Sequence, residues 1–367
     1  MMNKKKLWLI LLLPISGLIT LVAKNNPYIA EYVFARGIYR VYATLWGSIT
    51  SLLPFSLMEL GIIVLPILAI VLIVKWIVGI VRHKGERLLR FGNGIVNTIC
   101  LASVIVFWFT CFCGVNYHRY TIGEIMGLEV RDSSVEELNE LCLWLAEEAS
   151  SLRAELTSVD ENEAFKSTYT SFKDMTVDAR AAYDRLAKTY EQFDYQNFRA
   201  KPVFFSHLMS YTEIVGVYCV FSMEANINTD VSDYSIPDTM LHEMAHTYGF
   251  MREDEANFIS FLAGINSDSL EFRYSSYAHA LILAGNKLAA RDVDLYNKLW
   301  EHYDRGMVID FVKNSEYWDQ FEDTVIQEVS DTVNDTYLKV NNQTDGVESY
   351  GRMVDLLLAW YREEIAG

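Results

Sequence analysis

Three long apolar stretches near the start of this 367-residue chain constrain its fold more than any other feature. They cover about residues 7–23, 60–81 and 95–115. A helix needs roughly 20 apolar residues to cross the hydrocarbon core of a bilayer, so the second and third stretches predict transmembrane helices. The first is shorter, and a cleaved signal peptide is the alternative to an uncleaved anchor. We favour the anchor, because Leu21 is a poor residue three positions before a cleavage site at Ala23.

Basic residues mark two ends of these stretches. They precede the first stretch and lie between the second and third, at Lys4, Lys5 and Lys6 and at Arg82, Lys84, Arg87 and Arg90. By the positive-inside rule both groups belong on the cytoplasmic side. Three spans then place residues 24–57 and everything after about residue 118 outside the cell. The sequence therefore predicts a multi-pass protein of the bacterial cytoplasmic membrane with an extracytoplasmic domain.

The charge of the chain is divided in the same way. Residues 1–117 hold 11 Lys and Arg against 3 Asp and Glu, whereas residues 118–367 hold 20 against 45. We therefore predict two parts, a membrane anchor over 1–117 that contacts the lipid bilayer and a soluble domain over 118–367. The acidic domain would repel phosphate groups, which argues against nucleic acid as a partner.

The soluble part is expected to be mainly α-helical with a small β-sheet. Ser134 and Glu137 have the spacing of a capping box that opens a helix through about residue 157. Further helices are expected over about 177–193, 254–265, 270–288, 292–312, 315–338 and 347–364. The stretch Pro202–Met223 is rich in Val, Phe, Tyr and Ile and predicts two short strands. Residues 24–57 suggest an amphipathic helix on the membrane, under the soluble domain or against the other spans.

Residues 242–246 read HEMAH, which matches H-E-x-x-H. On a helix, His242 and His246 project from one face and can bind one metal ion, while Glu243 can reach a metal-bound water. The flanking residues Leu241, Met244, Ala245 and Tyr248 are apolar, so this helix should be largely buried. Two buried histidines one turn apart need a partner, and a metal ion supplies one.

A catalytic zinc usually takes three protein ligands, and His-His-Glu is a standard set. Gly249 can end the helix with a positive φ and turn the chain back towards the histidines. Glu253 is the favoured third ligand and Glu255 the rival. Asn257, four residues after Glu253, can hydrogen-bond a ligand histidine.

The H-E-x-x-H pattern is typical of zinc metallopeptidases. Such an enzyme needs two further parts, a strand edge that aligns the substrate and a hydrogen-bond donor for the oxyanion. The strand candidate is Gly216–Phe221, which includes Val217 and Tyr218. A simple buried strand explains the same residues equally well. For the donor, Tyr274 is the first choice among several residues that follow the third ligand, His279 included.

The run LHEMAHTYGFMREDEANFISFLA resembles the zincin metallopeptidases whose third ligand is a glutamate. More closely, the whole chain is similar to a bacterial membrane family called domain of unknown function 3810. The matching pieces are Pro54–Ser56, SHLMSYTEIVGVYCVFSMEANIN, the H-E-x-x-H block, Phe272–Ser275 and LKVNNQTDGVESYGRMVDLLLAWYR. The resemblance implies a zincin-like domain on a membrane anchor and a metallopeptidase activity with an unassigned substrate.

The expected function is hydrolysis of peptide bonds in a peptide or protein substrate, with Zn²⁺ as cofactor and Glu243 as general base. One alternative is a membrane-bound binding or scaffold protein with a structural metal site, which would have no use for Glu243. Another is a zinc hydrolase of a non-peptide cell-wall or lipid substrate. The polar flanks of the motif exclude a site inside the bilayer.

Overall fold

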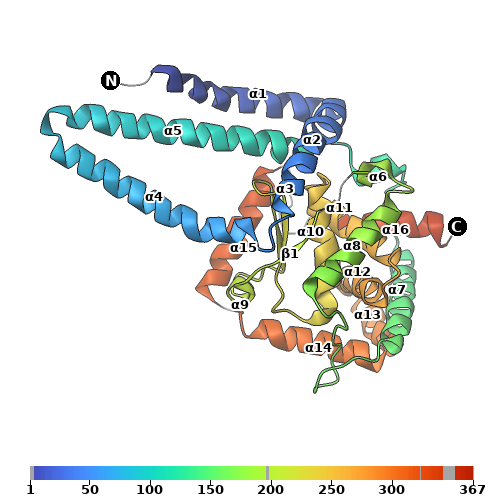
Figure 1. Cartoon of the computed structure of the whole chain (residues 1–367). Helices are drawn as coiled ribbons and strands as arrows, with labels where there is room; N and C mark the ends of the chain where they lie inside the picture. Colours follow the sequence, from blue (N-terminus) through green and yellow to red (C-terminus); the bar gives the residue numbers. More distant parts are fainter. Residues whose placement is uncertain (1–3, 196–197, 323, 342–351, 367) are drawn as a thin grey trace.

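The computed structural model describes residues 4–195, 198–322, 324–341 and 352–366. It has the predicted mainly α-helical fold, with long helices projecting from a helical domain that contains a small sheet (Figure 1). The domain helices that follow the membrane part are α6 (Ile122–Met126), α7 (Val135–Glu155), α8 (Phe172–Leu186), α9 (Ser206–Ser210), α10 (Ile236–Thr247), α11 (Glu253–Ile265), α12 (Leu270–Arg291), α13 (Val293–Leu299), α14 (Arg305–Asp319), α15 (Val325–Val340) and α16 (Arg352–Glu364).

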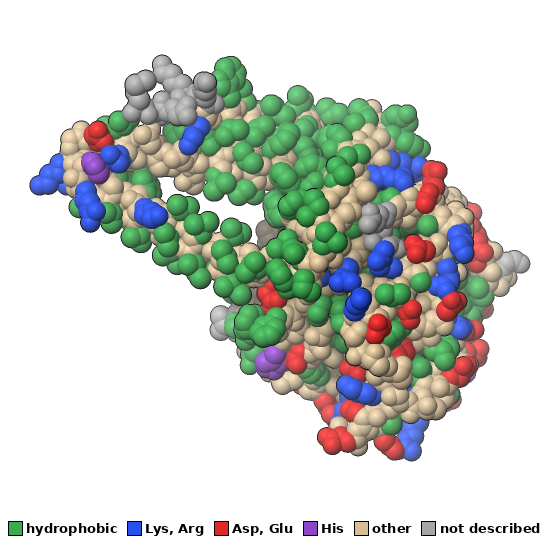
Figure 2. Space-filling model, in the orientation of Figure 1, with side chains coloured by type: hydrophobic (Ala, Val, Ile, Leu, Met, Phe, Trp, Pro, Cys, Tyr) green, Lys and Arg blue, Asp and Glu red, His purple; other side chains and the backbone are tan. Residues whose placement is uncertain are grey.

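Three segments are long and apolar enough to cross a membrane, Lys6–Asn25, Leu57–Arg82 and Lys84–Phe112. They correspond to η1 (Lys4–Leu11) with α1 (Leu12–Asn25), to α4 (Leu57–Arg82), and to η4 (Lys84–Glu86) with α5 (Arg87–Phe112). Apolar side chains cover these helices in Figure 2. The structure thus bears out three candidate spans near the predicted positions.

The basic turn between the second and third spans is shorter than predicted. Arg82 is the last residue of α4, and Arg87 is the first residue of α5. Arg90 lies one turn into α5, where it pairs with Glu86. The positive charges therefore surround a tight turn, which Figure 1 shows at the same end of the bundle as the N-terminus.

A helical run connects the first two spans and packs into the domain. It consists of η2 (Ile29–Tyr39), α2 (Arg40–Tyr42), η3 (Ala43–Gly47) and α3 (Ser48–Thr50). Tyr39 and Ala43 are fully buried in a cluster with Phe198 and Met251. The run also contacts the third span, since Tyr42 packs against Trp108 and Phe112 of α5. It therefore lies between the soluble domain and the other spans, so the second and third of the expected placements both hold. A division of the chain at residue 117 is wrong for this run, because it is part of the domain's core.

The sheet is small and lies beside the H-E-x-x-H motif of α10. Its strands β1 (Lys201–Pro202), β2 (Gly216–Cys219) and β3 (Glu224–Ile227) have the order β1-β3-β2. The central strand β3 pairs parallel with β1 and antiparallel with β2. The first predicted strand is largely wrong, since the chain turns after Pro202 into α9.

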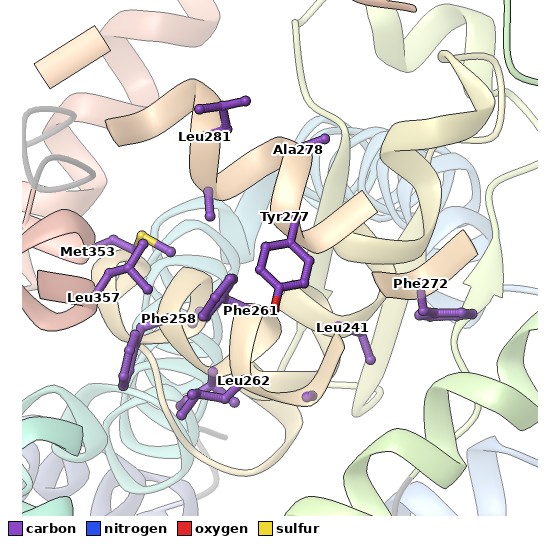
Figure 3. Close-up of a cluster of buried hydrophobic side chains, with 14 of the residues drawn as sticks. Leu241, Phe258, Phe261, Leu262, Phe272, Tyr277, Ala278, Leu281, Met353 and Leu357 are labelled. Carbon is purple, nitrogen blue, oxygen red and sulfur yellow. The ribbon is translucent and has the colours of Figure 1, made fainter. Parts of the chain in front are cut away.

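The main core lies between α7, α10, α11, α12 and α16. In Figure 3, Phe261 of α11 lies close to Tyr277 of α12, and their ring centroids are 5.6 Å apart. Several predicted helix boundaries move. The expected helix over 292–312 is broken, because Asp292 caps α13 and Asp304 caps a separate helix, α14. The core holds α11 against α10, and this packing positions the site.

Candidate metal centre

Helix α10 carries both histidines of the motif. Ser235 and Pro237 stand at its start, and nearly every residue after them is buried. The helix packs against β2 and β3 as well as against α11 and α12. A helix covered from several directions cannot present its histidines to bulk water, so their partners must come from the protein or from a bound ion.

The chain reverses direction immediately after α10. Gly249 has a φ of 81°, in the left-handed region that favours glycine. A Cβ there would lie 3.1 Å from Tyr39 Cε1, so the position is crowded as well. Arg252 ends the turn and donates through Nη2 to the carbonyls of Tyr117 and Arg119, each at 2.9 Å. These contacts fix the point at which α11 begins.

The first residue of α11, Glu253, faces both histidines. Its Oε2 lies 3.2 Å from His242 Nε2, and its Oε1 lies 3.8 Å from His246 Nε2. One ligand atom from each of the three residues lies within 4.8 Å of the others. Two imidazole nitrogens and one carboxylate thus converge on one point, as a His-His-Glu metal site requires.

The outer ring nitrogens of the histidines are also held. His242 Nδ1 lies 2.7 Å from Asn257 Oδ1, and His246 Nδ1 donates to the Phe250 carbonyl at 2.6 Å. Because both acceptors are oxygens, each Nδ1 carries a proton, and the Nε2 atom of each ring is the one that faces Glu253. The structure therefore brings Asn257 to a ligand histidine and adds Phe250 as a second support that the sequence did not indicate.

The two histidines differ in their electrostatics. Burial lowers the pKa of His246 to about 4, so its Nε2 is free to accept an ion at neutral pH. Burial also acts to lower the pKa of His242, but the adjacent Glu253 carboxylate outweighs burial and raises this pKa to about 9. The space between His242 and Glu253 therefore favours a positive charge. A metal ion that binds there would displace the proton from His242. The donor set fits a divalent ion.

Glu243 lies against the edge of the sheet. Burial raises the pKa of its carboxyl group to about 8, although the Tyr218 backbone N–H hydrogen-bonds to it. A Cβ on Gly216 would stand 2.6 Å from Glu243 Cγ and Oε1. Glycine is therefore required where β2 passes the carboxylate, a constraint on Gly216 that its sequence context does not show.

The free edge of β2 faces this carboxylate. The Asn228 amide donates to the Val215 carbonyl at 2.9 Å, so the alternate β2 residues Val217 and Cys219 are the ones that hydrogen-bond to β3. Alternation along an antiparallel pair then directs the backbone groups of Gly216 and Tyr218 away from β3. Among the described residues no further strand pairs with this edge. The predicted strand residues Gly216, Val217 and Tyr218 thus form an edge strand beside Glu243.

The other candidates have different partners. Glu255 is buried and accepts hydrogen bonds from the Ile122 amide at 2.8 Å and from Arg252 at 2.9 Å, so it braces the turn instead of joining the histidines. Tyr274 is also misassigned as an oxyanion donor. Its hydroxyl is fully buried and donates to Asp310 at 2.6 Å, in a cluster with Arg153.

His279 lies behind the metal centre. Its Nδ1 is hydrogen-bonded to Asp238, which belongs to the first turn of α10 and also receives a hydrogen bond from Ser276. The histidine therefore supports the N-terminal end of α10. It is not brought to the face on which Glu253 meets the two ligand histidines.

Tyr39 is the main residue of the site that sequence reasoning missed. Its hydroxyl donates to the His246 carbonyl at 2.9 Å and lies 2.9 Å from Tyr218 Oη. It thereby connects the helical run after the first span to both α10 and β2. The amphipathic pattern of residues 24–57 indicates that one face of this segment is buried, but it does not identify the partner of Tyr39.

Replacing Asn257 is expected to weaken metal binding. Asn257→Ala removes the acceptor at His242 Nδ1, so the ring is free to rotate and its nitrogen becomes less basic. Loss of such a partner typically costs 10–100-fold in metal affinity, so we expect a change of about that size. Competition with a chelator measures it. Asn266→Ala, at the other end of α11, is the control and should leave the affinity unchanged.

Adding a methyl group to β2 is expected to impair catalysis without removing the metal. Gly216→Ala places a Cβ on the Glu243 carboxylate, so either the side chain or the strand must move. Displacement of a catalytic group by about 1 Å can cost about 100-fold in rate. Turnover and zinc content should be measured together. In Gly285→Ala, the nearest atom is Tyr296 Cε2 at 3.4 Å, and this variant should match the parent.

Comparison with known proteins identifies a family and no established activity. No curated protein and no solved structure matches the chain. The model of a family described as "Protein of unknown function (DUF3810)" matches residues 34–358. This match begins within the helical run beneath the domain and continues into the last helix, so it includes two candidate spans and the cluster of His242, His246 and Glu253. The chain belongs to this family.

Proposed function

We propose that this protein is a membrane-anchored, zinc-dependent metallopeptidase that hydrolyses peptide bonds outside the cytoplasmic membrane. The observation that carries the proposal is the convergence of His242, His246 and Glu253 beside an additional buried carboxylate, Glu243. A structural zinc site is usually closed by four protein ligands, whereas a catalytic site has three and keeps one position open. Three ligands and an adjacent base favour catalysis over a structural role.

The chain's own residues divide the chemical work. Bound zinc would supply a Lewis acid and lower the pKa of a water molecule. Glu243 accepts a proton from the attacking water and later returns it to the leaving amine nitrogen. Gly216 leaves room for this carboxylate, and the Tyr218 amide orients it. Asn257 and Phe250 hold the ligand histidines in the tautomer that binds metal.

The edge strand offers a way to hold the substrate. An extended peptide can add to the free edge of β2 through backbone hydrogen bonds to Gly216 and to the Tyr218 carbonyl. Glu243 lies against the same edge, so a peptide bound there would pass directly in front of the general base. This arrangement favours a peptide over a cell-wall sugar or a lipid, because only a polypeptide continues the ladder.

The side of the membrane follows from the basic residues. Lys6 is the first residue of the first span, and Arg82, Lys84 and Arg87 surround the α4–α5 turn at the same end of the bundle (Figure 1). The positive-inside rule assigns this end to the cytoplasm. The domain at the opposite end would therefore be extracytoplasmic.

The test uses the full-length protein in detergent, because the helical run beneath the domain belongs to its core. We expect about one zinc ion per chain by elemental analysis, and its loss in His246→Ala. Cleavage of a peptide library should be followed by mass spectrometry, with cell-wall fragments and phospholipids incubated in parallel.

His302→Ala is the matched control, since this histidine lies in η8 (Trp300–His302), outside the metal centre. It should retain both zinc and activity. Absence of zinc from the parent protein, or equal zinc in both histidine variants, would refute the metal site. Zinc-dependent turnover of wall fragments or lipids without peptide cleavage would refute the substrate class.

A further inference from the structure

Large apolar side chains gather where α4 emerges from the domain. Leu52 is 81% exposed, Phe204 is 84% exposed and Leu208 is 61% exposed. Phe55 and Phe205 are each nearly half exposed beside them. We call these five residues the interfacial patch. Figure 2 shows apolar side chains continuing from the lower end of α4 onto the adjoining edge of the domain. Single exposed apolar residues are ordinary on a soluble surface, but a group of large ones indicates a contact.

The part of the patch before α9 is attached to the first turn of α4. The carboxylate of Glu59 accepts hydrogen bonds from the Phe204 amide at 3.0 Å and from the Phe205 amide at 2.7 Å. Glu59 is the third residue of α4. Both phenylalanines are therefore held at the level at which this candidate span begins.

The other part of the patch is fixed through a buried ion pair. Lys201 donates to the Phe55 carbonyl at 2.9 Å and forms a salt bridge with Glu224. Glu224 also accepts hydrogen bonds from the Leu57 and Met58 amides at the start of α4. The turn before α4 and the segment before α9 are thus joined to one helix terminus, which holds Phe55, Phe204 and Phe205 at the start of the span.

The length of α4 places this terminus at the membrane boundary. Its 26 residues extend about 39 Å at 1.5 Å per residue, whereas the hydrocarbon core is about 30 Å thick. The ends of α4 must therefore project into the headgroup region. The charged Glu59 also belongs outside the hydrocarbon. Side chains held beside it lie at the depth where membrane proteins place aromatic residues.

We propose that the interfacial patch inserts into the boundary between headgroups and acyl chains of the leaflet on the domain's side, with phospholipid as its occupant. The argument is the continuity of the patch with the lipid-facing surface of α4 and its attachment to Glu59. Phospholipid is preferred over a second copy of the chain, because a second copy would have to cover the patch within the headgroup region.

One consequence of this placement rests on the proposed function. The patch is close in sequence to the proposed substrate edge, because α9 ends at Ser210 and β2 begins at Gly216. Lipid contact would hold the substrate edge near the bilayer and favour membrane-proximal substrates.

The depth of the patch can be measured without any assumption about zinc or hydrolysis. Full-length Phe204→Cys and Leu208→Cys are labelled with the fluorophore NBD and reconstituted in phosphatidylcholine vesicles. Phosphatidylcholine that carries a nitroxide near the headgroup end of an acyl chain is the quencher. We expect about a twofold loss of fluorescence at both sites. Four native cysteines are buried and Cys219 is half-buried, so the labelled parent protein supplies the blank.

Val177→Cys is the control, because Val177 is 55% exposed on α8 and lies outside the patch. Its label should be quenched by aqueous iodide and hardly at all by the lipid nitroxide. Equal lipid quenching at positions 204 and 177 would overturn the proposal. Labels at 204 and 208 that are shielded from both quenchers would indicate a second copy of the chain and also overturn it. Thermal unfolding of each labelled variant should match that of the parent.

Discussion

Glu243→Gln is expected to abolish hydrolysis while zinc remains bound. Glutamine has nearly the same volume, so it fits beside Gly216 and can still accept the hydrogen bond from the Tyr218 amide. Its amide cannot take a proton from the attacking water. General acid–base catalysis contributes about 10²–10⁴-fold, so turnover should fall by about that factor. The measurement is turnover on a cleaved library peptide, with zinc content determined on the same preparation.

Two variants separate this role from that of the ligands. Glu253→Gln should weaken zinc binding itself, because it replaces the charged ligand by a neutral amide. Glu140→Gln, on the exposed face of α7, should change neither zinc content nor turnover. If Glu243→Gln cleaves as fast as the parent, Glu243 is not the general base. If it also loses zinc, the distinction between ligand and base is wrong.

Glu31→Ala is expected to lower the free energy of unfolding of the protein strongly. The carboxylate of Glu31 is fully buried and makes two hydrogen bonds to Arg119, at 2.7 and 2.8 Å. Removing one partner of a buried pair leaves the other charge uncompensated, which costs about 3–5 kcal/mol. Arg119 also lies 4.0 Å from the centre of the Phe250 ring and donates to the Tyr248 carbonyl. The turn between His246 and Glu253 should therefore loosen, and zinc affinity should fall as well.

The melting temperature of the full-length protein in detergent measures the loss, which we expect to be about 10 °C. Glu316→Ala is the control. It breaks an exposed pair with Lys313, and such pairs contribute little. A melting temperature for Glu31→Ala equal to that of this control would show that the buried pair does not hold the run to the domain.

The contribution of Glu31 also has a defined pH dependence. Burial alone would raise the pKa of Glu31, but hydrogen bonds from Arg119 and Arg36 outweigh it and lower the pKa below its ordinary value. A carboxyl group whose pKa is lowered on folding stabilises the protein above its unfolded pKa and loses this effect as the pH falls through the folded value. The difference in melting temperature between parent and Glu31→Gln should be full at neutral pH and shrink below about pH 4. A difference that stays constant into acid would contradict the assignment.

Local sequence determined much of the fold. Apolar length predicted the three candidate spans, because crossing a bilayer imposes a length that short-range sequence shows directly. The capping box at Ser134 and Glu137 is present as predicted, since it involves residues three apart. The positive φ of Gly249 also follows from a local requirement, the reversal of the chain after a buried helix. The helix expected over 177–193 instead begins at Phe172 and ends at Leu186, because the Ser171 side chain caps its first turn.

Only the tertiary structure decided between Glu253 and Glu255. They lie two residues apart on α11, and their directions differ because Arg252 and the Ile122 amide hold Glu255 away from the histidines. No local pattern contains that information, since Ile122 is more than a hundred residues distant. The role of Tyr274 also depends on a contact distant in sequence. Its position after α11 suggests an oxyanion donor, but its hydroxyl donates to Asp310.

The sequence by itself determined a membrane-anchored helical chain with two histidines on one face of a buried helix and a glycine turn after them. Periodicity, length and capping act over a few residues, so they can be read without a structure. The tertiary structure decided which glutamate completes the cluster, that Gly216 must lack a side chain, and that Tyr39 belongs to the site. These outcomes depend on packing between segments far apart in the chain, where burial and unpaired charge select one arrangement.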